Sequence, residues 1–369
     1  ADESIYEYPM QQGGGNDGRP YSFGRPSSGG SKAAYPCKSY GQGRINPAYF
    51  YGVFDPNDMR RDVSITMTGS NGKGVEKLIP FVPNSKAEGG GLTLNKWDEN
   101  RQANPWVAAQ RKSGINGPYM RMSEVYLGYA EVCAALGDVV TGKQYLKTVR
   151  ERSFPQGLAN TDAFIASFGN DLVRAIIEER GFEYAGEGDR RWTLIRSGYL
   201  PEDIKRIKDM TKAMMDGLAT KGYYEFENGN IISAYIWTKL VDAKTIYGHR
   251  LTAQCPTDKV NDPVLYPGWR GQKDNWEEMG LNYGSSTPAT NLAIKGLFEI
   301  VSEEEAASLE SQGYAKVNWG IDLVDYRDEY DKYLFWDYDY VSAPIYLWPF
   351  TPNVMAAGGF TNGYGFKQE

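Results

Sequence analysis

The clearest hydrophobic pattern of the chain lies between residues 119 and 152, where apolar side chains recur at helical spacing. The apolar positions of the first stripe are Tyr126, Ala130, Cys133 and Ala134, and those of the second are Tyr145, Leu146 and Val149. Gly137-Asp138 separates the two stripes and is typical of a helix break. The pattern predicts a helical hairpin of tetratricopeptide character, with small residues where the two helices cross.

Two more amphipathic stretches follow this hairpin and extend the helical part to residue 220. Phe164, Ile165 and Phe168 continue the stripe of residues 172–177, which predicts one core helix from Phe164 to Ala185. Residues 201–220 predict a solvent-facing helix, with a proline near its start and acids in its first turn. Because one hairpin does not make a stable solenoid, we expect the helix from Phe164 to pack on it.

The remaining sequence is rich in loops and aromatic residues and carries only short regular patterns. Residues 2–10 predict an extended piece, residues 62–67 a strand, residues 231–240 a strand or short buried segment, and residues 303–312 a helix. We therefore predict a mainly α, tetratricopeptide-like scaffold with long irregular loops and a few short strands. Three regions are expected: a loop-rich segment 1–118 that forms part of the ligand-binding face, a helical core 119–220, and an aromatic-rich region 221–369 that packs on this core.

A dense cluster of charges follows the predicted core helix. Acids, arginines and large apolar groups alternate through the sequence EERGFEYAGEGDRRWTLIR, residues 178–196. Two carboxylates in a cleft would suit acid/base chemistry if their pKa values were pushed apart. Nearby arginines would instead hold the acids ionised. We therefore interpret the cluster as arginine–carboxylate bridges that tie the helix end to the following loop.

The same residues resemble a known family. The spacing Glu179-Arg180…Glu183 and the run from Arg191 to Arg196 resemble the central signature of the SusD/RagB family. Further likenesses lie at ADESIYEYPM, at Asp55-Pro56, in the predicted hairpin, and in residues 344–366. A departure is Gly181, where the family more often has a bulky or basic residue. Because glycine weakens a helix by about 1 kcal/mol relative to alanine, we expect the helix to end near this position.

The resemblance implies a surface lipoprotein of the bacterial outer membrane that binds a nutrient and serves a SusC-type TonB-dependent transporter. It also implies that this chain corresponds to the later two-thirds of such a protein, with the lipid anchor upstream. An oligosaccharide is the first expected ligand. Binding of oligopeptides, as in a RagB-like subunit of a peptide importer, is the second alternative, and glycoside hydrolysis is the third.

Composition excludes several other functions. The formal net charge is −7, with acids and bases spread along the chain, so no basic tract is available to follow a nucleic acid. No apolar run approaches the roughly 18 residues of a membrane span, and the first ten residues are not a signal peptide. The three cysteines, Cys37, Cys133 and Cys255, cannot form a disulfide framework. Because His249 is the single histidine, most histidine-based metal sites are excluded, and a catalytic triad would depend on this one residue. We expect no enzyme activity, no cofactor and no metal.

Aromatic residues next to amides and charges are the candidates for ligand contacts. An exposed ring can stack on the C–H bonds of a sugar while neighbouring polar groups bond its hydroxyls. The candidate residues are Tyr49, Tyr51, Trp97, Trp106, Trp269 and Trp276. Three consecutive aromatics at positions 49–51 cannot all point inward from one helix face, so at least one should reach the surface. The alternative for every one of the candidates is burial in the core.

Overall fold

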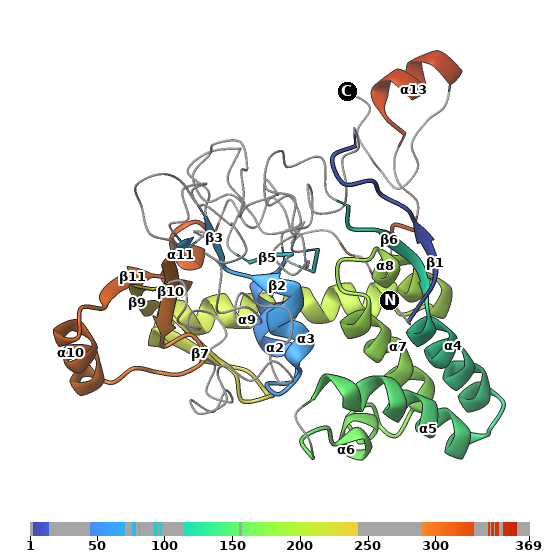
Figure 1. Ribbon diagram of the computed structural model, residues 1–369, viewed down its shortest axis with the longest axis horizontal. Coiled ribbons are helices and arrows are strands. Elements are labelled where there is room, and N and C mark those ends of the chain that lie inside the picture. Colours follow the sequence, from blue (N-terminus) through green and yellow to red (C-terminus); the bar gives the residue numbers. More distant parts are fainter. Residues whose placement is uncertain are drawn as a thin grey trace.

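The fold is shown by a computed structural model (Figure 1). It describes residues 3–14, 45–70, 76–78, 81, 92–94, 96–97, 114–154, 157–242, 290–327, 339, 341–342, 344–346 and 350–359. Helices dominate these residues, and the strands among them are short. The expected mainly α fold with a few short strands is confirmed.

The helices of the central region follow one another closely along the chain. They are α4 (Met122–Ala135), α5 (Val139–Arg150), α6 (Thr161–Ala166), α7 (Leu172–Glu183), α8 (Asp189–Ser197) and α9 (Leu200–Lys221), with a short 3-10 turn at Glu151–Ser153. Side chains cap several of them: Asp138 accepts from the Thr141 N–H, Asn160 from Ala163, and Asp171 from Arg174. Such caps satisfy backbone donors that the first helical turn leaves without partners.

Helices α4 and α5 form the predicted antiparallel hairpin, and α7 packs against both (Figure 1). Leu127 and Ala130 of α4, Leu146 of α5, and Ala175 and Ile176 of α7 share one buried cluster. Nearly every residue of α7 is buried, including its charged ones, so α7 is the central helix of the fold. The expected packing of this helix on the hairpin is therefore confirmed.

The prediction of one continuous helix from Phe164 to Ala185 is wrong. The chain forms α6, breaks, and then forms α7, because Gly169 and Asn170 both adopt φ of 65° in the left-handed region. The Asn170 amide then donates to the Ile165 carbonyl and closes the end of the first helix. Phe164 and Phe168 still pack on the hairpin cluster, so the apolar stripe continues through the break.

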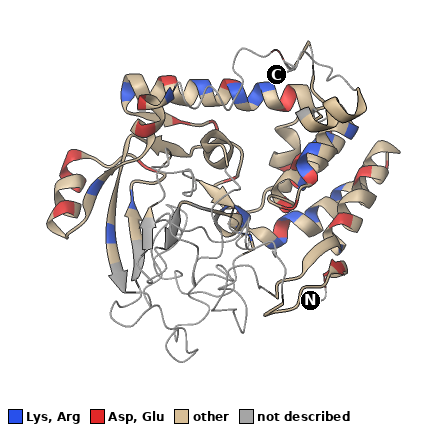
Figure 2. Ribbon diagram, turned by 90° about the horizontal axis from the view of Figure 1, so that it is seen from above, with Lys and Arg blue, Asp and Glu red and all other residues tan. Residues whose placement is uncertain are grey.

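A second, larger core lies between α9 and the segments on either side of the helical region. Helix α2 (Pro47–Gly52) contributes Phe50 and Tyr51, and Phe54 follows in the turn before helix α3 (Met59–Ser64). Helix α9 contributes Met214 and Met215. Figure 2 shows basic and acidic residues alternating along α9, whose buried side supplies those methionines. The predicted helix over 201–220 is confirmed. The expected strand at 62–67 is largely wrong, because helix α3 occupies Met59–Ser64 and only Ile65–Thr66 is extended.

The strands form small antiparallel sheets. The three-stranded sheet has the order β10-β9-β11, built from β9 (Tyr235–Asp242), β10 (Thr290–Lys295) and β11 (Ala315–Asn318). The two-stranded pairs are β1 (Ser4–Tyr8) with β6 (Gly117–Arg121), β2 (Ile65–Thr66) with β5 (Thr93–Leu94), β3 (Thr68–Ser70) with β4 (Glu76–Leu78), and β7 (Tyr223–Glu225) with β8 (Ile231–Ser233). The expected extended piece at 2–10 is confirmed. The extended conformation expected at 231–240 is also confirmed, but it is divided between β8 and β9, which belong to different sheets.

Within the described residues of the C-terminal region, three further helices occur. They are α10 (Glu303–Ser311), α11 (Gly320–Asp325) and α13 (Pro352–Gly358). Helix α10 begins with a capping box in which Ser302 and Glu305 bond each other's backbone N–H, and it matches the helix predicted over 303–312. Leu323 of α11 and Trp319 just before it are buried in the larger core. The division of the chain into three regions stays a prediction.

Candidate functional site

Buried carboxylates gather on helix α7 and form a cluster of ion pairs among the described residues. Glu178, Glu179 and Glu183 project from this helix and are 2%, 0% and 3% exposed. Ionised carboxylates so far from water need partners, because desolvation costs several kcal/mol for each ion. Each of the three is held by two or more arginines.

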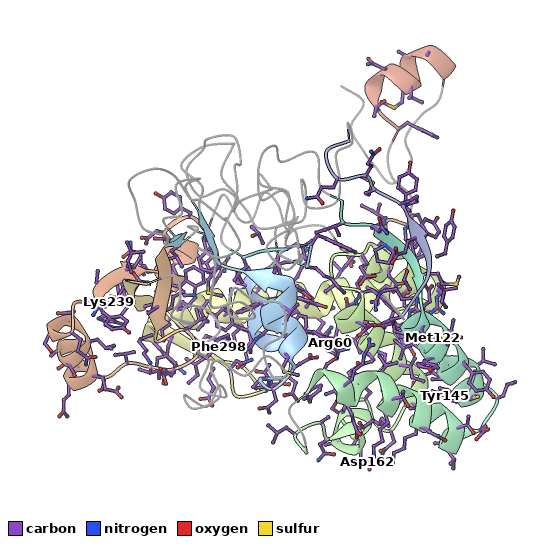
Figure 3. The ribbon with its side chains drawn as sticks, in the orientation of Figure 1. Arg60, Met122, Tyr145, Asp162, Lys239 and Phe298 are labelled. Carbon is purple, nitrogen blue, oxygen red and sulfur yellow. The ribbon has the colours of Figure 1, made fainter. Side chains whose placement is uncertain are left out.

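Glu183 joins three distant parts of the chain. Arg60 of α3 donates to it at 3.1 Å, Arg121 at the start of α4 donates at 2.8 Å, and Arg152 also pairs with it. Arg60 bridges further to Glu179 at 2.6 Å, and Glu179 receives Arg150 of α5 at 2.9 Å. Figure 3 shows Arg60 between the short helices α2 and α3 and the helical hairpin. The cluster therefore connects α3, the hairpin and α7.

Glu178 forms the centre of a second group. Arg190 of α8 donates to both of its oxygens at 3.0 Å and also pairs with Asp203 of α9 at 3.0 Å. Arg190 lies over Gly181, where an added Cβ would come within 2.8 Å of the guanidinium. Helix α7 continues two residues past Gly181 to Glu183, so the expectation that it ends near this glycine is confirmed. The glycine also leaves room for the arginine, and its carbonyl accepts from Tyr49.

The charges around Glu183 decide its protonation. Burial alone would raise the pKa of this carboxyl, but Arg60, Arg152 and Arg121 outweigh burial and lower the pKa to about 2. A carboxylate held ionised in this way is a poor proton donor at neutral pH. The interpretation of the cluster as arginine–carboxylate bridges is confirmed. The segment that it ties to the helix end is helix α8 rather than a loop.

Tyr51 lies in the protein interior, and Tyr49 is half-buried beside it. Tyr51 is 0% exposed, and its hydroxyl accepts a hydrogen bond from the Trp319 indole at 2.9 Å. The Tyr49 hydroxyl donates to the Gly181 carbonyl, and burial raises the pKa of Tyr49 to about 12. The expectation that Tyr51 contacts a ligand is wrong, because its ring stacks on Phe226 in the larger core. For Tyr49, which packs against the edge of that core, the expectation stays a prediction.

Trp97 lies against the turn between α7 and α8. Its ring is 7% exposed, and its Nε1–H donates to the Gly186 carbonyl at 3.4 Å. The neighbouring Lys96 donates to the Glu183 carbonyl at 2.6 Å and pairs with the Glu187 carboxylate. The expectation that Trp97 is exposed to a ligand is therefore wrong. Trp106, Trp269, Trp276 and His249 lie outside the described residues, and the expectations for them stay predictions.

Exposed aromatic residues occur at positions that the sequence reasoning missed. Tyr6 and Tyr8 of β1 and Tyr119 of β6 are 62%, 65% and 76% exposed. The rings of Tyr6 and Tyr119 meet edge to face with centroids 5.9 Å apart. The only sequence signal was the extended piece at 2–10 with tyrosines at every second position, which favours one common face. We refer to β1 and β6 together as the β1–β6 ribbon.

A cavity of about 320 Å³ lies at the end of the β1–β6 ribbon, where β1 begins and α4 starts. Its lining residues are Glu3, Met122, Ser123, Tyr126, Thr148, Val149 and Arg152. Arg152 donates to Glu3 at 2.7 Å across this cavity. Figure 3 shows Met122 where the ribbon meets α4. The cavity combines an aromatic ring, aliphatic groups, a hydroxyl and an ion pair, which is a lining suited to a small polar ligand.

The described part of the chain has neither a metal-ligand cluster nor a membrane-spanning helix. Within these ranges, His, Cys, Asp and Glu do not gather in threes in a way that could hold a metal ion. None of the helices described is both long enough and apolar enough to cross a bilayer. The expectation of no metal and no cofactor stays a prediction.

Comparison with known proteins gives a family for the chain. Residues 1–350 match the model of the SusD family. A SusD-like protein of Formosa agariphila is 28% identical over 160 residues, which are 43% of this chain and 26% of that protein. The match thus spans about a quarter of this relative's length.

Solved structures of similar proteins cover about half of this chain. A SusD homolog from Bacteroides thetaiotaomicron has 23% identity and a TM-score of 0.31, covering 44% of this chain and 33% of its own. Surface glycan-binding protein A of the same species, in complex with laminarihexaose, has 18% identity and a TM-score of 0.36, covering 54% of this chain and 44% of its own. Since the family model matches residues 1–350 of 369, the chain belongs to the SusD family.

Proposed function

We propose that this protein binds an oligosaccharide at the surface of the bacterial outer membrane and delivers it to a SusC-type TonB-dependent transporter. The observation that carries this proposal is the match of residues 1–350 to the SusD family. The motif likeness around Glu179-Arg180…Glu183 lies within this match and agrees with it. Attachment to the membrane is by a lipid anchor that is not part of the described fold.

The charge cluster favours binding over hydrolysis. A glycoside hydrolase needs one carboxyl with a raised pKa as proton donor and a second carboxylate beside the scissile bond. Glu183 has the opposite property, because three arginines lower its pKa to about 2. Glu178 and Glu179 are buried and engaged by arginines in the same way. These acids brace the scaffold and are not arranged for proton transfer to a substrate.

Trp106, Trp269 and Trp276 remain the proposed contacts of the ligand. Each stands in the sequence among amide, carboxylate or arginine side chains, a combination that can stack on a sugar ring and bond its hydroxyls. Peptide binding uses overlapping chemistry, since tyrosines and paired charges also suit a peptide backbone. The experiment therefore has to offer both ligand classes.

Isothermal titration of the purified protein tests the proposal. We expect heat of binding with at least one hexasaccharide of a panel containing laminarihexaose and maltohexaose, and none with a mixture of tryptic peptides. Saturable binding of peptides without binding of any glycan would favour the oligopeptide importer. Release of reducing sugar from a bound glycan would favour a hydrolase. Co-purification with an outer-membrane transporter from the native membrane tests the delivery step separately.

A further inference from the structure

We propose that the β1–β6 ribbon and the cavity at its Glu3 end form one sugar-binding surface, on which tyrosine faces and the cavity take successive pyranose rings. The inference rests on the proposed function and locates the glycan-binding site on the fold. This surface is built from described residues and uses none of Trp106, Trp269 and Trp276, which the sequence alone had suggested.

The exposed tyrosines supply the stacking faces. These tyrosines do not contribute to the described core, because Tyr6, Tyr8 and Tyr119 are each more than half exposed. The edge-to-face contact of Tyr6 with Tyr119, at an interplanar angle of 81°, holds both rings in fixed orientations. Rigid aromatic side chains lose little conformational entropy when a ligand docks on them. Three such rings on two paired strands make a platform rather than scattered surface aromatics.

A fixed polar pair braces the ribbon. The Asn116 amide donates to the Glu7 carboxylate at 2.6 Å, and the Asn116 side-chain oxygen accepts from the Met10 N–H at 2.9 Å. The hydrogen bond from Asn116 also lowers the pKa of Glu7. Glu7 lies between Tyr6 and Tyr8 in the strand, and side chains alternate along a strand, so this pair supports the ribbon and is not one of the sugar contacts on the tyrosine face.

The cavity supplies a concave end to this platform. Its volume of about 320 Å³ lies at the small end of the range for ligand pockets, roughly 300–1,000 Å³. Tyr126 and Val149 offer apolar faces, and the Glu3–Arg152 pair offers both donors and acceptors whose positions are fixed. A single pyranose matches this combination of apolar faces and polar groups better than an aliphatic or a purely anionic ligand does.

The dimensions favour an oligosaccharide over a single sugar. Strand β1 spans five residues, which corresponds to roughly 17 Å at about 3.3 Å per residue. The cavity begins at Glu3, one residue before the strand, so platform and cavity are continuous along the chain. An extended glycan can thus place one ring in the cavity and further rings on the tyrosines.

The test compares two tyrosine variants by titration with laminarihexaose and maltohexaose. We expect the double variant Y6A/Y119A to lose at least about tenfold in affinity without a change in melting temperature, because both rings are exposed. The control is Tyr129→Ala on α4, a half-exposed tyrosine that also meets another tyrosine edge to face but lies outside the cavity lining. We expect the control to bind as the unaltered protein does.

A second variant tests the cavity without touching the ribbon. Thr148 is exposed on α5 and lines the cavity, so Thr148→Leu should fold normally and reduce the affinity by narrowing the cavity. Equal affinity of Y6A/Y119A, Thr148→Leu and the Tyr129 control would overturn the inference while leaving the proposed function intact. Failure of the unaltered protein to bind any glycan would overturn both. Loss of peptide or transporter binding with glycan binding retained would assign the ribbon to a protein partner and overturn the inference.

Discussion

Replacing Glu183 by glutamine tests whether the buried charge cluster holds the scaffold together. Glutamine keeps the size of the side chain, so the packing around it is retained, but it removes the negative charge. Arg60, Arg121 and Arg152 would then face a neutral amide in a site where the side chain is only 4% exposed. Arg60 and Arg152 keep other acidic partners, Asp58 and Glu3 respectively. The variant therefore isolates the contribution of one central carboxylate.

Two separate arguments give a similar value for the loss of unfolding free energy. Removing one partner of a buried ion pair typically costs about 3–5 kcal/mol, because the remaining charge is left without compensation. A pKa lowered from 4.5 to about 2, at about 1.4 kcal/mol for each pH unit, corresponds to roughly 3 kcal/mol of stabilisation at neutral pH. We therefore expect the free energy of unfolding to fall by about 3 kcal/mol in Glu183→Gln.

The pH dependence provides an independent check with a definite sign. Because the folded-state pKa of Glu183 lies below its unfolded value, the unfolded chain binds more protons between pH 4.5 and about 2. The stabilisation is complete above pH 4.5 and is lost as the pH falls through this window. Below the window the variant and the unaltered protein should differ much less than at pH 7, since the carboxyl is then protonated in both states of the unaltered protein.

Urea unfolding followed by circular dichroism, at pH 7 and at several values between 5 and 2, measures both effects. The matched control is Asp209→Asn on α9, which removes an acid from the exposed Lys205–Asp209 pair. Exposed pairs contribute about 0–1 kcal/mol, so this control should unfold nearly as the unaltered protein does. A loss below about 1 kcal/mol in Glu183→Gln, or a difference from the unaltered protein that does not shrink in acid, would refute the structural role of the cluster.

Three further substitutions separate the parts of the scaffold. Trp97→Ala should lower the melting temperature and cost about 3–5 kcal/mol, as expected for a large buried ring, whereas unchanged stability in thermal unfolding would show that the ring is not packed. Gly181→Ala should cost roughly 1–3 kcal/mol despite the better helix propensity of alanine, because the new Cβ displaces Arg190; a stabilised variant in urea unfolding would contradict that contact. Arg180→Ala should fail to express, or should unfold at a much lower urea concentration than the unaltered protein, because it leaves Asp189 without its arginine partner at 2.6 Å. An unchanged urea midpoint would show that this ion pair does not stabilise the fold.

The helical part of the fold could be predicted from sequence because its signals are local. Apolar spacing, Gly137-Asp138 and the proline of α9 all act within a few residues, and the observed helices follow them. The break at Gly169-Asn170 was missed because the stripe of Phe164 and Phe168 keeps its phase across it. The periodicity of apolar residues indicates which positions face the core, and it does not indicate where two residues adopt the left-handed conformation and end a helix.

The candidate site could be predicted only in part, because exposure depends on contacts distant in sequence. The charge cluster was recognisable from its density, but its partners Arg60 and Arg150 come from elsewhere in the chain. Tyr51 and Tyr6 illustrate the same difficulty. Both are tyrosines beside other aromatic or polar residues, yet Trp319, 268 positions away, buries the first, while the second stays in water on the ribbon.

The arrangement of the cluster bears on how a loop-rich protein can bind a ligand at all. Long loops lose conformational freedom on docking unless a rigid frame already fixes their ends. Lys96 and Trp97 are fixed by the turn after α7, and Arg121 joins the end of β6 to Glu183 and Glu187. Glu183 at the end of α7 and the turn after it, which contains Gly186 and Glu187, thus hold both the ribbon and the Lys96–Trp97 segment. If Glu183→Gln weakened glycan binding at a temperature where the variant remains folded, the ion pairs would set the geometry of the binding surface as well as its stability.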